Sequence, residues 1–560
     1  MTSLANKITE KKKTDNHHKS LNNKTRNKTI MIQGTASNVG KSLLAAALCR
    51  IFKQDGFRVA PFKSWNMSLN SFVTPEGGEI GIAQAIQAEA AGVSPTVDMQ
   101  PILVKPKGDG LSQVVVRGKP IGDMGYQQGS EEYIKWALDI IRGSLNRLKD
   151  KYEIVVLEGA GSPAEINVKK RDLANMKVAA LNKTPVILVA DIDRGGAFAS
   201  LVGTLQLLEA EERELVKGFI INRFRGDVDI LQPGIDFLEE YTGRPVLGVI
   251  PYLRDIKLPE EDSVSLIKQE GRSTLQEEIK IGVIRLPHIS NFTDFASLAG
   301  EPDVSLTYIE ETRELTELDL IIIPGTKSTT TDLEYLKKTG LAERIMELSR
   351  DGLPVMGICG GFQMMGRRLL DPHHTEGPIE EISGLGILPV ETTFLPEKTT
   401  HQVKARVTGQ GLLLSGLKDQ IVEGYEIHMG ESRYLSRSRS QAQSQTQSCL
   451  QSQSPSQPYF ISPFRIYKRS GQRVDVRDGA VSENGLHFGT YIHGIFNNDH
   501  FRRSFLNRLR KRKGLSPEGS GFSYRQKLDA DYDKLAEIVR ENLRMEFIYD
   551  LLKIDEGDNR

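Results

Sequence analysis

The sequence has few cysteines, no excess of either charge and no long apolar run, and each absence excludes a class of protein. Three cysteines in 560 residues, Cys49, Cys359 and Cys449, have no paired or metal-like spacing, which argues against a disulfide framework and a zinc site. Basic and acidic residues both number 73, so no net charge favours nucleic acid or an anionic membrane as partner. No apolar run approaches the ~20 residues of a membrane span. We therefore expect a cytoplasmic protein with neither nucleic acid nor membrane as partner.

The hydrophobic pattern predicts an α/β fold with parallel sheets. Short apolar runs such as "TIMIQG", "EIVVLEGAG" and "VKGFIINRF" alternate with longer mixed segments up to about residue 251. This rhythm is typical of strands that are buried on both faces and joined by helices. After a charged stretch, in which we place a domain boundary near residue 270, the rhythm restarts with "IKIGVIRLP", "LDLIIIPG" and "LPVMGIC".

A chain of this length should hold two or more domains. The last segment has helical apolar spacing and should form one or two helices packed on the second domain. The Ser/Gln-rich insertion has too little apolar content to fold and should be a floppy loop. The predicted organisation is a disordered basic tail at 1–28, a P-loop synthetase domain at 29–270, a second domain at 278–510 with the insertion at 434–459, and a helical tail at 511–560.

The segment "TIMIQGTASNVGKSLLAAALCRIF" predicts a strand, a glycine-bearing loop and a helix. Gly40, Lys41 and Ser42 fit the end of a P-loop, although Gly34 stands one residue too early for the general pattern. Backbone N–H groups at a helix N-terminus bind phosphate, a lysine there reaches the outer phosphates, and the hydroxyl ligates Mg²⁺. We predict an ATP site; the alternative is a helix N-terminus with a chance lysine.

Two strand ends add acidic residues where such a site needs them. Glu158 follows the run "EIVVL", and Asp191 ends "VILVAD". Ligands of open α/β sheets bind at this edge, so both are candidate Mg²⁺ ligands beside Ser42, with ordinary helix-capping acids as the alternative. Lys63, in "PFKSWNMSLNS", is a candidate to steady a substrate carboxylate or its phosphorylated form.

The stretch "GICGGFQMMG" places Cys359 among glycines after the apolar run "LPVMGI". Gly357, Cys359 and Gly361 have the spacing of a nucleophile elbow, a strained turn that presents a nucleophile. The helix expected over "FQMMGRRLL" would aim its N-terminus at the sulfur, with Gly360 N–H as an oxyanion donor. The alternative is a buried structural cysteine.

A cysteine nucleophile needs a base, and two histidines follow apolar runs as Cys359 does. His493, in "GTYIHGIF", is the first choice and His428, in "YEIHMGE", the second; either could instead be a hydrogen-bonded core residue. The loop "IIIPGTKSTTTDL" offers the Gly325 region as a second oxyanion donor.

These motifs resemble two known families. The second half is similar to class I glutamine amidotransferase domains, with "GICGGFQMMG" as the cysteine elbow and "GTYIHGIF" as the histidine segment. The first half resembles the dethiobiotin synthetase-like P-loop family, whose loop has the spacing G-T-x-x-x-V-G-K-[ST]. The early glycine is therefore a feature of that family. The ATP-binding residues that this resemblance implies are Gly34, Thr35, Asn38, Gly40, Lys41 and Ser42.

Joined in this order, the two halves resemble the cobyric acid synthase family, through segments such as "NMSLNS", "EGAGSPAEIN", "LPHISNFTDF" and "YEIHMGE". The resemblance implies ATP–Mg²⁺- and glutamine-dependent amidation of the b, d, e and g carboxylates of the corrinoid adenosylcobyrinic acid a,c-diamide, a step of cobalamin biosynthesis. Glutamine would be hydrolysed at Cys359 with His493 as base. Many class I domains orient the histidine with a glutamate two residues later, but here that residue is Ile495, so the orienting group is undetermined.

Three questions stay open at this point. A sister enzyme, cobyrinic acid a,c-diamide synthase, has the same plan of two domains. A non-catalytic P-loop switch or scaffold protein is an alternative of another class, although it would have no use for a cysteine elbow. The sequence also leaves the oligomeric state open between a monomer and a homo-oligomer.

Overall fold

The computed structural model describes residues 28–108, 111–125, 130–253, 256, 258–259, 278–435, 462–519 and 521–554. The predicted basic tail, the boundary near residue 270 and nearly all of the Ser/Gln-rich insertion lie outside the described residues, so the domain limits stay predictions. Among the described helices, none combines the length and the apolar character of a membrane span.

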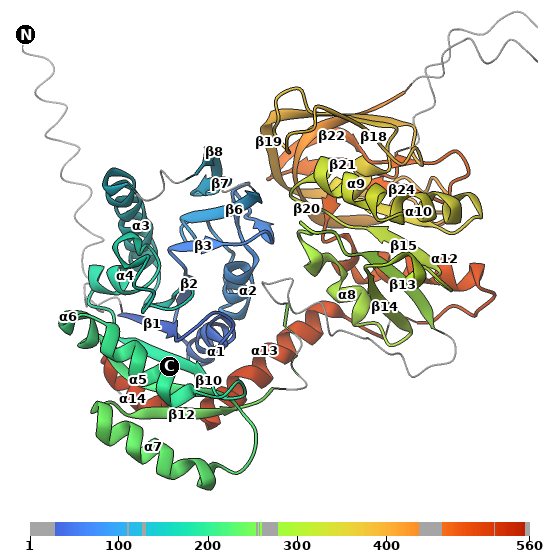
Figure 1. Cartoon of the computed structure of the whole chain (residues 1–560). Helices are drawn as coiled ribbons and strands as arrows, with labels where there is room; N and C mark the ends of the chain where they lie inside the picture. Colours follow the sequence, from blue (N-terminus) through green and yellow to red (C-terminus); the bar gives the residue numbers. More distant parts are fainter. Residues whose placement is uncertain are drawn as a thin grey trace, which may run out of the picture.

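The N-terminal domain is built on one sheet of six parallel strands (Figure 1). Alternate residues of each strand face opposite sides, so Ile30 and Ile32 pack in one helical layer and Met31 in the other. Because both faces are buried, the strands appear in the sequence as continuous apolar runs, and the predicted α/β fold is confirmed. In sheet order the strands are β12 (Val246–Pro251), β11 (Val216–Phe224), β10 (Val186–Asp191), β1 (Lys28–Gly34), β9 (Ile154–Glu158) and β2 (Val59–Phe62).

Helices cover both faces of this sheet (Figure 1). Helix α1 packs on one face, and α3, α4, α5 and α7 supply the apolar residues of the other layer. The helices of this domain are α1 (Lys41–Gln54), α2 (Ile82–Ala90), α3 (Glu131–Lys151), α4 (Met176–Leu181), α5 (Ala197–Leu207), α6 (Ala210–Arg213) and α7 (Val228–Thr242).

The C-terminal segment forms two helices, α13 (Tyr524–Glu541) and α14 (Met545–Leu552), as predicted, but their expected position on the second domain is wrong. They pack on α1 and complete the core of the N-terminal domain, where Tyr532 and Leu535 are fully buried. Arg50 of α1 binds the Asp533 carboxylate of α13 at 2.7 Å. The C-terminal helices therefore contribute to the apolar layer on the same face of the N-terminal sheet as α1.

A mainly antiparallel excursion, in which only β3 and β6 pair in parallel, leaves the N-terminal sheet after β2; the sequence did not predict it. It contains a hairpin and a four-stranded sheet on the side that faces the C-terminal domain (Figure 1). The hairpin pairs β4 (Ser71–Val73) with β5 (Glu79–Gly81), and the sheet pairs β3 (Trp65–Met67), β6 (Ile102–Gly108), β7 (Leu111–Val116) and β8 (Lys119–Met124).

The C-terminal domain has a second, mainly parallel sheet with a single core of its own. Its strands, in sheet order, are β14 (Val304–Ile309), β13 (Ile279–Ile284), β15 (Leu320–Ile323), β16 (Val355–Ile358), β24 (Phe488–Thr490) and β23 (Ala480–Val481), of which β23 is antiparallel. Its helices are α8 (Ala296–Ala299), α9 (Thr329–Lys338), α10 (Leu341–Arg350), α11 (Gly360–Met364) and α12 (Asp499–Arg512).

A further sheet of seven strands extends this domain and carries the histidine segment. Its two long strands, β19 and β20, pair antiparallel over most of their length. The strands are β17 (Arg368–Leu370), β18 (Glu381–Ser383), β19 (Val390–Val407), β20 (Ile421–Tyr434), β21 (Phe464–Arg469), β22 (Gln472–Asp478) and β25 (Ile492–His493).

The β4–β5 hairpin joins the two domains. The Asn291 backbone N–H donates to Asn70 Oδ1 at 2.6 Å, and Asn291 Nδ2 donates to the Ser71 carbonyl oxygen at 2.9 Å. Val73 of the hairpin packs with Tyr425 and Ile427 of β20 in a small buried cluster. This contact places the excursion of the N-terminal domain directly beside β20, which leads to the pocket described next.

Candidate active sites

Cys359 lies on a strained turn between β16 and α11. Its backbone has φ 52° and ψ −111°, a conformation that costs free energy in a residue with a Cβ atom. The flanking glycines are required by close packing: a Cβ atom on Gly357 would lie 2.6 Å from the backbone of Phe362, and one on Gly361 would overlap the Ile323 carbonyl. This is the turn that the glycine spacing predicts. The helix after it is shorter than predicted, because Arg368–Leu370 form strand β17.

His493 ends β25 and is held by a buried carboxylate that the sequence analysis missed. Its Nδ1–H donates to Asp294 Oδ2 at 2.6 Å, and the Gly494 backbone N–H donates to Asp294 Oδ1 at 2.8 Å. Burial by itself lowers the pKa of His493, but Asp294, with Cys359 as a second partner, raises it to about 10. Asp294 belongs to the segment "LPHISNFTDF", which carries the family resemblance. An acidic residue in that segment was the feature of the sequence that could have indicated it.

The second histidine candidate, His428, lies in a different environment. Its Nδ1–H donates to the Gly430 carbonyl oxygen at 3.2 Å, and its ring stacks on Tyr491 with centroids 3.8 Å apart. Burial lowers its pKa to about 3, which keeps the ring neutral. The nearest carboxylate oxygen, Glu426 Oε1, lies 4.0 Å from His428 Nε2, and both oxygens of Glu426 are bound by Arg469. His493 instead binds its own carboxylate at 2.6 Å, so the geometry favours His493 as the base.

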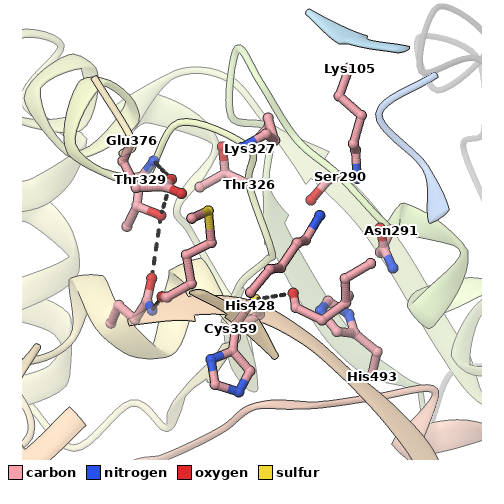
Figure 2. Close-up of a pocket in the computed structure, with 14 residues that line it drawn as sticks. Lys105, Ser290, Asn291, Thr326, Lys327, Thr329, Cys359, Glu376, His428 and His493 are labelled. Carbon is pink, nitrogen blue, oxygen red and sulfur yellow. Dashed lines mark hydrogen bonds between the residues drawn. The ribbon is translucent and has the colours of Figure 1, made fainter. Parts of the chain in front are cut away.

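Cys359, His493 and His428 line one pocket of about 450 Å³, counting the space open at its mouth (Figure 2). The Cys359 thiol donates to the Ile427 carbonyl oxygen at 3.5 Å. Gly360 is the first residue of α11, so its N–H has no partner within the helix.

Gly325 lies against His493, since a Cβ atom there would be 3.1 Å from His493 Cε1. Gly325 and Gly360 are the chain neighbours of Thr326 and Cys359, which line the pocket, and their predicted roles as oxyanion donors remain a proposal.

The pocket wall also includes Lys105 of the N-terminal domain. Lys105 Nζ and Lys398 Nζ, from the two domains, each lie 2.6 Å from a different carboxylate oxygen of Glu79. Burial opposes ionisation of Glu79, but the two ammonium groups hold its pKa well below the usual range. The cysteine pocket is thus closed on one side by an ion cluster that spans the domain interface.

The predicted ATP loop lies at the other edge of the N-terminal domain, between β1 and α1. Gly40 has φ 98° and Asn38 φ 59°, so the loop uses two left-handed residues. Asn222 Nδ2 of β11 donates to the Val39 carbonyl at 2.7 Å, and the Thr35 N–H donates to the Val189 carbonyl at 2.9 Å. Neighbouring strands therefore hold the loop from Gly34 to Ser42 in an open turn in front of the helix, as a phosphate site requires.

Lys41 points back over this loop. Its Nζ donates to the carbonyl oxygens of Ala36 and Gly161, at 2.8 and 3.1 Å. A lysine folded over the loop in this way stands where it can meet phosphate oxygens.

Glu158 accepts hydrogen bonds from three side chains, of which Ser42 and Lys63 were predicted site residues and Gln87 was not. Ser42 Oγ donates to Glu158 Oε1 at 2.7 Å, Lys63 Nζ donates to the same oxygen at 2.9 Å, and Gln87 Nε2 donates to Oε2 at 2.5 Å. Burial raises the pKa of Glu158, but the Lys63 ammonium and the hydrogen bonds lower it overall. The adjacent Ser42 hydroxyl and Glu158 carboxylate are hard oxygen donors of the kind that Mg²⁺ prefers.

Asp191, the other predicted metal ligand, has a different set of partners. Arg223 Nη1 donates to its Oδ2 at 2.9 Å, and the Asp193 N–H donates to its Oδ1 at 3.0 Å. Within the described residues no hydrogen bond joins Asp191 to Ser42 or Glu158. Ser42, Glu158 and Asp191 all stay predicted ligands of Mg²⁺.

Comparisons with known proteins agree with this architecture. Residues 30–266 match the CobQ/CobB/MinD/ParA nucleotide binding domain, and residues 280–501 match the CobB/CobQ-like glutamine amidotransferase domain. The cobyric acid synthase of Dehalococcoides mccartyi is 50% identical over 94% of this chain and 99% of its own. That of Desulforamulus reducens is 49% identical over 95% of this chain and 99% of its own.

This chain belongs to the cobyric acid synthase family. It is an amide-forming ligase of cobalamin biosynthesis, with an N-terminal nucleotide-binding domain and a C-terminal glutamine amidotransferase domain. The match over nearly the whole chain favours this family over the sister diamide synthase and over a non-catalytic switch or scaffold protein.

Proposed function

We propose that this chain hydrolyses glutamine at Cys359 and uses the ammonia, with ATP, to amidate the b, d, e and g carboxylates of adenosylcobyrinic acid a,c-diamide. The main support is one pocket in which a cysteine on a strained turn lies with a histidine paired to a buried carboxylate. The corrinoid and its adenosyl form rest on membership of the family. A cytoplasmic location is part of the proposal and agrees with the free thiols of Cys49 and Cys359.

In the first half-reaction the Cys359 sulfur attacks the side-chain carboxamide carbon of glutamine. His493 protonates the nitrogen as the C–N bond breaks, so ammonia leaves and a γ-glutamyl thioester remains. Water that has lost a proton to His493 then hydrolyses the thioester to glutamate. Asp294 accepts the Nδ1–H bond and keeps Nε2 available for the proton transfers, and Gly360 and Gly325 would stabilise the oxyanion.

In the second half-reaction a corrinoid carboxylate attacks the γ-phosphorus of ATP, ADP leaves and an acyl phosphate forms. Ammonia attacks the acyl carbon, phosphate leaves, and the amide forms with loss of a proton. Lys41 and the loop N–H groups would hold the phosphates, and Lys63 would bind the charge of the activated carboxyl group. Mg²⁺, which Ser42, Glu158 and Asp191 would hold, neutralises phosphate charge when bound.

The test is to incubate the protein with adenosylcobyrinic acid a,c-diamide, ATP, Mg²⁺ and glutamine and to follow the mass of the corrinoid. We expect stepwise replacement of four hydroxyl groups by amino groups. Cobyrinic acid, offered in parallel, tests the sister activity. A corrinoid whose mass stays unchanged, in a protein that still hydrolyses glutamine, would contradict the proposed substrate.

A further inference from the structure

Three lysines line the cysteine pocket, and one of them has no ionic partner. Lys105 and Lys398 both bind Glu79. Lys327 is only 7% exposed, and in the part of the chain that the structure describes no carboxylate lies within ion-pair distance of its Nζ. Burial lowers the pKa of Lys327, and the nearby charge of Glu376 partly opposes this change. A buried ammonium group without a partner is costly, which makes Lys327 a candidate to bind an anionic group of a ligand.

Glu376 is the acid nearest to this lysine in the same pocket. It is also 7% exposed, and its Oε2 accepts hydrogen bonds from the Thr329 N–H at 3.1 Å and from Thr329 Oγ1 at 3.2 Å. The Glu376 N–H in turn donates to Asp371 Oδ2 at 2.8 Å, which fixes the loop that carries it. Glu376 is therefore a carboxylate held in one orientation at the wall of the pocket.

The two groups lie on the opposite side of the pocket from the reacting residues. Figure 2 shows Lys327 and Glu376 near Thr329, away from Cys359 and His493. Lys327 belongs to the loop between β15 and α9, and Glu376 to the connection between β17 and β18. Glutamine has matching chemistry, because its reactive carboxamide and its charged α-carbon groups stand at opposite ends of a short chain.

We propose that Lys327 binds the α-carboxylate of glutamine and that Glu376 binds its α-ammonium group. The inference rests on the proposed glutaminase function and adds an explanation of how the pocket would distinguish glutamine from other primary amides. A primary amide that lacks either charge leaves one of the two buried groups without a partner, and such a mismatch costs binding free energy. The pair therefore selects glutamine among small primary amides.

The test compares three amides on three variants. Glutaramate lacks only the α-amino group of glutamine, and γ-aminobutyramide lacks only the carboxylate. Lys327→Met should lower kcat/KM about 10- to 100-fold for glutamine and glutaramate, which carry the carboxylate, and leave γ-aminobutyramide unchanged. Glu376→Gln should lower it for glutamine and γ-aminobutyramide and leave glutaramate unchanged. Lys338→Met, an exposed lysine of α9, is the matched control and should change none of them.

Binding can be measured without turnover from the protection of the Cys359 thiol against iodoacetamide. The same pattern of losses should appear in the protecting concentrations of the three amides. An equal loss for all three amides, or no loss, would contradict binding by Lys327 and Glu376. An unchanged value for the amide that lacks the affected charge would show that the amidotransferase domain of each variant is folded. If the wild-type protein hydrolyses no glutamine, the proposed function itself is wrong, a result distinct from failure of binding by Lys327 and Glu376.

Discussion

Asp294→Asn tests the most specific feature of the glutaminase site. Both carboxylate oxygens of Asp294 accept N–H bonds, from His493 Nδ1 and from the Gly494 backbone. An asparagine side chain can accept at only one of these positions, because its amide nitrogen would face the other N–H group. The variant must therefore leave one donor unsatisfied or force His493 into its other tautomer.

The expected loss is large. The same substitution in a Ser-His-Asp triad lowers kcat by about 10⁴ through the wrong tautomer, so we expect kcat for glutamine hydrolysis to fall by about 10³ to 10⁴. Amidation with added ammonia should continue at the wild-type rate, since that reaction needs neither His493 nor Cys359. Asp475→Asn, which alters an exposed ion pair with Arg465, is the control and should change neither rate.

The pH dependence of stability gives a second measurement. The pKa of His493 is raised from about 6.5 in the unfolded chain to about 10 in the folded protein. The pairing of His493 with Asp294 therefore contributes its full free energy to the folded state below pH ~6.5. This contribution is lost as the pH rises through 10. The wild type should exceed Asp294→Asn in free energy of unfolding by about 3–5 kcal/mol near pH 6. Denaturation at a series of pH values should show this difference narrowing toward pH 10.

A glutamine-dependent rate within tenfold of the wild type, or a stability difference that does not depend on pH, would refute the role assigned to Asp294.

Three further predictions test other parts of the molecule. Lys41→Met should abolish ATP-dependent amidation with either nitrogen source while glutamine hydrolysis continues, as measured by separate ammonia and corrinoid assays; equal loss of both would contradict the separation of the sites. Glu79→Gln leaves Lys105 and Lys398 without their buried carboxylate and should destabilise the domain interface by about 3–5 kcal/mol, seen as glutamine hydrolysed without amidation; full coupling would contradict this. Leu535→Ala on α13 should destabilise the N-terminal domain by about 2–5 kcal/mol in denaturation, whereas a change confined to the C-terminal domain would contradict the packing on α1.

The sequence predicted the parts of the fold that depend on local pattern. Strands buried on both faces are continuous apolar runs, so β1, β9 and β10 could be recognised without knowledge of their neighbours. In the excursion after β2, the strands β3, β4 and β5 have only three residues each, and segments that short cannot be told from loops by their pattern. Helix α13 could be recognised from its spacing, but an amphipathic face does not specify which core it will cover.

In the candidate site, too, local sequence patterns could be predicted and contacts that depend on tertiary packing could not. Cys359 could be predicted because its turn needs glycines at fixed local positions, and His493 because it follows a strand. Their roles stay predictions until activity is measured. The partner of His493, Asp294, could not be assigned, because it comes from a turn almost two hundred residues earlier and meets the histidine only through the packing of two sheets. Pairing over such a distance leaves no periodic signal in one sequence.

The central claim is that ammonia released at Cys359 is the nitrogen that enters the corrinoid. The most direct measurement supplies glutamine labelled with ¹⁵N in its side-chain amide, together with unlabelled ammonium, ATP, Mg²⁺ and adenosylcobyrinic acid a,c-diamide, and determines the isotope in the amidated product. The coupled reaction predicts ¹⁵N in the product of the wild type and only unlabelled nitrogen in that of Cys359→Ala. A wild-type product that carries only nitrogen from the solution would contradict the account.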